Sequence, residues 1–358
     1  MTALTGKAMP RTRKHPVPLR PMARATWLQH RAALITLLAV SAALALAMVA
    51  GELAVQAAYA HYAADGCVLH PIHAPCGTIA NTIAASTNGF TALVIALHVL
   101  PILLGVFIGA PLISRELESG TFRFTWTQGV GRARFVLTTV ALLAAAVTAA
   151  TCALGVLLSW YARPFDVVGV ESHWQSGLFG TTPLMLPAWT LFALGTGIFL
   201  GTLTGRVVTA MAATAAAAGG LLVAAFWELD HHVLSLGALA AHALPAGGLS
   251  IGLLNESASP GLGPAGSWLV RGWITGPGGH QLSTTAADNL QNRMYAATTK
   301  AGNNNDPSAW LSLHHYAYWL SYQPAGRFWY FQATAAAVLI TLAIVFALMT
   351  IWLVRRRG

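Results

Sequence analysis

The chain has 358 residues, of which 56% are hydrophobic and only 9% are charged. A soluble globular domain carries about a quarter charged residues. The composition therefore excludes an ordinary soluble protein and indicates a membrane protein. The formal net charge of +9 has to be interpreted together with the topology of the chain.

Apolar segments long enough to cross a membrane recur along the chain, since a helix needs about 20 apolar residues to traverse the hydrocarbon core. No convincing small-residue cleavage site follows the first of them, so we expect it to stay in the protein as an anchor. The predicted spans are residues 32–51, 90–113, 135–159, 183–204, 207–227 and 329–354. We therefore predict an all-α membrane protein, a bundle of six transmembrane helices.

The distribution of basic residues predicts the orientation, because cytoplasmic loops carry an excess of Lys and Arg. With six spans both termini lie on one side of the membrane, and we assign that side to the cytoplasm because it holds 15 of the 20 basic residues. The five that lie opposite are Arg163, Arg271, Arg293, Lys300 and Arg327. The positive charge thus reflects topology and contact with anionic lipids, and we predict no binding to nucleic acid.

The predicted domains follow the spans. Trp27, with Arg24 and Arg31 on either side, favours a helix lying at the membrane interface. The stretch 231–249 is too short and broken to span, so we expect a re-entrant helical hairpin there. We divide the chain into a disordered basic cytoplasmic tail at 1–21, an interfacial helix at 22–31, spans one to five at 32–227, an outer segment at 228–328, and the sixth span with a basic cytoplasmic end at 329–358.

Two cysteines, Cys67 and Cys76, lie close together in the first outer loop. A disulfide is our preferred interpretation because this loop lies on the oxidising side of the membrane. The alternative is a metal site that includes the nearby His61, His70 and His73. Their spacing matches no familiar zinc pattern, so we predict no metal site.

The fourth predicted span carries a glycine every four residues, at Gly197, Gly201 and Gly205. Such a row lets a partner helix approach closely. Two interpretations stay open: packing inside the bundle, or a seam between two copies of the chain.

Ionisable residues near the spans are further candidates, because they are costly in a membrane and often functional. Near the outer end of the fifth span they are Glu228, Asp230, His231 and His232. We expect a solvated helix end there, since no HExxH pattern is present. In the second span, His98 and Pro101 predict a kink with a polar group that faces the bundle interior.

Nothing in the sequence resembles a phosphate-binding loop, because none of the three lysines, Lys7, Lys14 and Lys300, follows the required glycine spacing. We therefore predict that the chain is not itself an enzyme, has no catalytic residues and binds no cofactor.

The cytoplasmic stretch between the second and third spans is unusually polar for this chain. Ser114 is placed to cap a short helix on the cytoplasmic face, with Glu118 in its first turns, and Gly120 is placed to end it. Acidic residues contribute little to topology, so orientation alone does not explain the glutamates. A surface of this kind suits the docking of a cytoplasmic partner.

This stretch, GAPLISRELESGTFRFTWTQGVGRARFVLTT at 109–139, together with SYQPAGRFWYFQ at 321–332, resembles the permease subunit of actinobacterial type-2 ABC transporters. The resemblance extends through all six spans and their order. It implies that the loop 114–134 forms a coupling helix that fits a cleft on an ATPase subunit. It assigns transmission of the ATP-driven movement to Arg115, Glu116, Glu118, Gly120 and Thr121.

The resemblance further implies a multi-pass protein of the plasma membrane that moves its substrate by alternating access, in the direction of export. ATP and Mg would be used by separate ABC ATPase subunits, and the permease would form a homodimer or pair with a second permease. Two other functions stay open. One is a membrane-embedded enzyme that acts on lipid or cell-wall precursors through the outer segment 228–328, and the other is a ligand-binding receptor or immunity protein.

Overall fold

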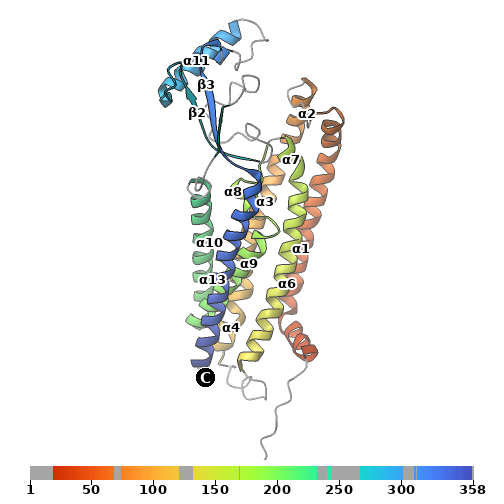
Figure 1. Ribbon diagram of the computed structural model, residues 1–358. Coiled ribbons are helices and arrows are strands. Elements are labelled where there is room, and N and C mark those ends of the chain that lie inside the picture. The colour runs from red at the N-terminus through yellow and green to blue at the C-terminus, as the bar shows by residue number, and fades with distance from the viewer. Residues whose placement is uncertain are drawn as a thin grey trace, which may run out of the picture.

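The computed structural model is a helical bundle with a small lobe at one end (Figure 1). The residues that it describes are 19–67, 74–120, 132–168, 170–231, 240–243, 267–300, 310–311 and 313–356.

In the described part of the chain, six helical segments are long and apolar enough to cross a membrane, which confirms the predicted number. They are α1 (Leu19–Ala64), the second span formed by α3 (Thr87–Leu104), the π-helix η1 (Gly105–Gly109) and α4 (Ala110–Glu118), then α6 (Arg132–Tyr161), α9 (Met185–Thr204), α10 (Val207–His231) and α13 (Phe328–Arg356). Shorter helices are α2 (Ala74–Ala84), α7 (Arg163–Val168), α8 (Ser176–Phe179), the 3-10 turn η4 (Ala325–Arg327) and α11 (Thr284–Lys300).

The N-terminal part of the chain differs from the prediction. Helix α1 begins at Leu19, so residues 19–21 are helical rather than disordered, and the predicted interfacial segment 22–31 continues directly into the first span. Its place at a membrane surface stays a prediction. Residues 1–18 lie outside the described part of the chain.

The outer segment contains a β-sheet, so the prediction of an all-α protein is wrong there. Three antiparallel strands, β1 (Ala240–Ala243), β2 (Trp268–Thr275) and β3 (Ala317–Gln323), lie in the order β1-β3-β2. The sequence of β3, AYWLSYQ, is rich in aromatic residues that fit a half-buried pleated surface. Figure 1 shows β2, β3 and α11 together, at the opposite end of the molecule from the C-terminus.

The sheet has a small core of its own. Tyr318 and Leu320 of β3 are buried with Ile274 of β2 against Leu290 and Met294 of α11. Because side chains alternate across a strand, Tyr318 and Leu320 share one face of β3.

The predicted re-entrant hairpin does not hold at residues 240–243. These four residues form strand β1, which pairs with β3 from Ala240 opposite Tyr322 to Ala243 opposite Trp319. The remainder of the stretch after His231 lies outside the described residues.

A disulfide joins Cys67, just after α1, to Cys76 in α2, with the two Cα atoms 5.5 Å apart. Both cysteines are fully buried beside Tyr62. The bond fixes the loop between the first two spans against the C-terminal end of α1. His70 and His73 of this loop lie outside the described residues.

Helix α9 occupies the centre of the bundle and contacts α3, η1, α4, α6, α10 and α13. Its closest approach is to the second span. A Cβ atom added at Gly197 would collide with the backbone of Gly105 and Ala110, and one at Gly201 would collide with the carbonyl oxygen of Ala110. The second span contributes two glycines of its own, Gly105 and Gly109, to this contact. We call the contact between these four glycines the glycine seam.

An added Cβ at Gly105 would lie only 2.5 Å from the carbonyl oxygen of Ala193, and one at Gly109 would lie 2.8 Å from that of Leu194. The two backbones therefore touch where side chains are missing, as in other small-residue interfaces of membrane helices. The glycine row of α9 is used inside the bundle, which rules out the interpretation as a seam between copies for Gly197 and Gly201.

Gly205 does not belong to this packing row. It has a left-handed backbone with a φ of 64°, ends α9, and donates its N–H to the carbonyl oxygen of Gly201. A left-handed residue at a helix C-terminus favours glycine. The predicted packing role at Gly205 is therefore wrong, because the sequence row continues past the end of the helix.

The glycine seam yields a stability prediction. Gly201→Ala should lower the free energy of unfolding by about 1–3 kcal/mol, because the new methyl group overpacks a backbone contact that cannot yield. Thermal unfolding of the purified protein in detergent measures the effect. Gly220→Ala is the matched control: nothing lies within 4 Å of that position, so this change should be neutral or stabilising by up to about 1 kcal/mol through helix propensity. Equal stabilities of the two variants would contradict the seam.

The predicted orientation can be tested at two exposed positions in a Cys152→Ser background. Gly278 lies in a turn of the outer lobe and Arg206 lies between α9 and α10. In intact cells a membrane-impermeant maleimide should label Gly278→Cys, whereas Arg206→Cys should react only after permeabilisation. The reverse pattern would invert the topology.

Candidate functional site

The predicted coupling residues lie at the end of the second span and not on a separate surface helix. Helix α4 continues the span through η1 without a break. Ser114 does not cap a helix: it is buried inside α4, where its hydroxyl donates to the carbonyl oxygen of Ala110 at 2.7 Å. The expected short helix on the cytoplasmic face is therefore wrong for residues 114–118, because the glycine seam holds this turn against α9.

The end of the span is as predicted from its glycine. Helix α4 stops at Glu118, and Gly120 has a φ of 67°, in the left-handed region that glycine adopts at low cost. The N–H of Ser119 donates back to Arg115, and that of Gly120 donates to Leu117. Thr121 and the rest of the loop up to residue 131 lie outside the described residues, so the docking surface predicted there stays a prediction.

One coupling residue reaches another span. A carboxylate oxygen of Glu118 accepts a hydrogen bond of 2.8 Å from the backbone N–H of Val207, the first residue of α10. The first N–H groups of a helix have no partner within the helix, and its N-terminus carries a partial positive charge, so a carboxylate is well suited there. Glu118 thus links the end of the second span to the start of the fifth, and Arg115 is exposed on the same helix.

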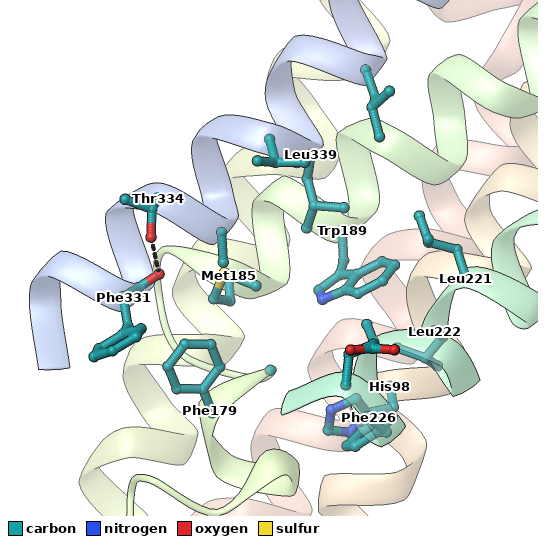
Figure 2. A pocket seen from close by; sticks show the side chains of 16 residues that line it. His98, Phe179, Met185, Trp189, Leu221, Leu222, Phe226, Phe331, Thr334 and Leu339 are labelled. Carbon is teal, nitrogen blue, oxygen red and sulfur yellow. Dashed lines mark hydrogen bonds between the residues drawn. The ribbon is translucent and has the colours of Figure 1, made fainter. Parts of the chain in front are cut away.

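A cavity of about 380 Å³ lies between four spans, in the halves of these helices that are nearer the β-sheet. Its lining is mainly apolar and comes from α3, α8, α9, α10 and α13 (Figure 2). Figure 2 shows His98 with Phe226 on one side of the cavity and Phe179 with Phe331 on the other. The full lining is His98, Phe179, Gly180, Met185, Trp189, Leu221, Leu222, Ala225, Phe226, Glu228, Phe331, Thr334, Ala335, Val338, Leu339 and Leu342.

His98 faces the bundle interior, as predicted. Its side chain is only 8% exposed, and its ring lies against Phe226 with the two centroids 4.8 Å apart. Pro101 lies inside α3 about one turn later, and the π-helix η1 follows directly after Leu104. A proline inside a helix removes one backbone hydrogen bond, and π turns are often found at functional sites.

A buried polar contact lies at the edge of the cavity, beside Phe179. Gln332 of α13 accepts a hydrogen bond of 2.8 Å from the hydroxyl of Thr182 and donates one of 2.9 Å to the carbonyl oxygen of Phe179. Gln332 and Thr182 are both buried. Since each polar group is satisfied, this contact fixes α13 against the segment that precedes α9.

Sequence reasoning missed the cavity, because its lining comes from helices that are far apart along the chain. It also missed Gly105 and Gly109, although their spacing of four residues in GVFIG is the usual small-residue signal for close helix packing.

The acidic and histidine cluster near the outer end of α10 is described only in part. Glu228 lines the cavity, whereas the side chains of Asp230 and His231 and all of His232 lie outside the described residues. In the part of the chain that the structure describes, no group of three or more metal-ligating side chains lies together.

Comparison with protein families is informative about the bundle. A family model described as ABC-2 membrane transporter related matches residues 22–228, more than half of the chain. The chain belongs to this family. The match covers the first five spans and ends at Glu228, beside the cavity, so the outer lobe and α13 lie beyond it. A search of curated proteins and a search of solved structures found no match.

Family membership makes this ABC-2 protein a multi-pass membrane permease component of an ABC transporter. It also implies pairing with an ABC ATPase subunit. Members of this class form the membrane part of the transporter, so the family agrees with the interpretation that the chain is not the catalytic subunit.

The Glu118 contact predicts a local change in the permease. In Glu118→Ala the amide of Val207 loses its acceptor, so the first turn of α10 should fray and exchange its amide hydrogens about tenfold faster. Hydrogen–deuterium exchange followed by mass spectrometry checks this. Arg115→Ala, one turn away on the exposed side of α4, is the control and should leave exchange in α10 unchanged. Equal exchange in both variants would show that the link has no influence on α10.

Proposed function

We propose that this permease works with separate ABC ATPase subunits as an exporter and moves its substrate by alternating access. The observation that carries the proposal is the hydrogen bond between Glu118 and Val207, which joins the predicted ATPase-coupling end to a span that lines the cavity. ATP binding would draw the ATPases together, and the movement would enter the permease at residues 115–121.

Two routes lead from this end to the cavity. The first is the second span itself, a continuous helix that runs from Glu118 through η1 to His98. The second starts at the Glu118 carboxylate and follows α10 to Phe226 and Glu228. A tilt of the cytoplasmic end would therefore act on two walls of the same cavity.

A change between two conformations needs a ligand that binds them with different affinities. In this proposal the ligand is the nucleotide, held with Mg by the ATPase subunits. The permease would pair with a second copy or with another permease in the plasma membrane. Export is proposed from the resemblance to type-2 ABC permeases, and the predicted orientation would place the cavity nearer the outer face of the membrane.

Affinity purification from the native host in mild detergent tests the proposal. The wild-type chain should retain an ABC ATPase, together with ATP hydrolysis, and Glu118→Arg should lose both, because charge reversal disrupts the coupling end. Asp288→Arg makes the same kind of reversal on exposed α11 of the outer lobe, and it should retain the ATPase.

The result for the wild type tests the transporter assembly, and the result for the variants tests the role of Glu118. If no ATPase accompanies the wild type, the proposed transporter assembly is wrong. If both variants retain an active ATPase, the proposed assembly stands, but Glu118 is not part of the surface that binds the ATPase.

A further inference from the structure

The cavity between the spans has one buried polar group that has no hydrogen-bond partner among the described residues. Nε2 of His98 is buried and has no hydrogen-bond partner among the described residues. His98 lines both the main cavity and a small adjoining one near Pro101. An unsatisfied buried polar group is costly, which is why such groups are rare outside functional sites.

The other ring nitrogen determines what Nε2 can bind. Nδ1 of His98 lies 2.8 Å from the carbonyl oxygen of Val94. A carbonyl oxygen only accepts hydrogen bonds, so Nδ1 carries the proton and donates. In the neutral ring Nε2 then holds a lone pair and is an acceptor. A ligand group that binds Nε2 must therefore be a hydrogen-bond donor.

The rest of the lining determines the body of the ligand and its charge. Apolar side chains (leucine, phenylalanine, methionine, tryptophan, alanine and valine) make up most of the wall, so an apolar body is preferred. The carboxyl group of Glu228, at the outer end of α10, opposes an anionic ligand. The cavity therefore favours a ligand whose head group is neutral or cationic.

We propose that this cavity binds an amphiphile with an apolar body and a hydrogen-bond donor, a hydroxyl or an amine, which donates to Nε2 of His98. The ring of Phe226 lies beside this nitrogen-bearing ring, with the two centroids 4.8 Å apart, and forms one side of the proposed donor site. This inference rests on the proposed function for its role as the transported class, but binding itself requires no ATPase. The cavity lies within one chain, so no second permease is needed.

Binding is measured on the full chain alone, in nanodiscs of phosphatidylcholine, by equilibrium dialysis of radiolabelled probes against empty nanodiscs. Two matched pairs separate the donor from the charge. Dodecanol and dodecyl methyl ether are neutral, with and without a donor. Dodecylamine and dodecyltrimethylammonium are cationic, again with and without a donor.

The donor-bearing member of at least one pair should bind saturably at one per chain and about tenfold more tightly than its partner, the effect of one hydrogen bond to a buried acceptor. The preferred pair then identifies a neutral or a cationic ligand. His98→Phe keeps an aromatic ring beside Phe226 but removes the acceptor, and it should bring this ratio to about one.

Ala335→Phe fills the cavity from α13 and should abolish saturable binding of all four probes without touching His98. Thermal unfolding verifies that both variants are folded. The inference is overturned if no probe binds saturably, if neither donor is preferred, if His98→Phe preserves the ratio, or if Ala335→Phe leaves binding intact. A wild-type chain that binds these probes but purifies without an ATPase would refute the proposed transporter and leave this site standing.

Discussion

The close approach of α9 to the second span is the constraint on which the rest of the bundle depends. Gly197 and Gly201 meet Gly105 and Ala110 backbone to backbone, and no side chain is available to act as a spacer. In a bilayer, lipid tails are as apolar as leucine, so helix association relies on close packing and on hydrogen bonds between helices. The seam supplies the first of these at the centre, and α6, α10 and α13 pack around α9.

Because the seam holds the second span at its π-helical turn, the two ends of that span serve different purposes. The end at Glu118 presents a carboxylate to the start of α10, while the other half of the span places His98 in the cavity wall. The contact of Gln332 with Thr182 holds the opposite wall. The cavity is therefore bounded by elements that are each held by contacts to other parts of the bundle.

The membrane spans could be predicted because their signal is local: length, hydropathy and basic flanks are all visible in one stretch of chain. Gly120 could also be assigned from a local rule for helix ends. The strand β1 could not, since AAHA owes its conformation to pairing with β3, about 80 residues later in the chain. Ser114 was misjudged for a similar reason: its surroundings are set by α9 and not by its neighbours. The sequence also predicts the inward orientation of His98. It does not predict the cavity that His98 faces, because the other walls come from helices that are distant in the chain.

The π-helix η1 has a consequence for anyone who maps the faces of the second span on a helical wheel. A π turn accommodates one extra residue, and one residue corresponds to a rotation of about 100° around a helix axis. The residues of α4 are therefore offset by that angle from the faces that α3 would project. A wheel drawn continuously from Thr87 to Glu118 would therefore misplace Arg115 and Glu118 by about 100° relative to the faces of α3.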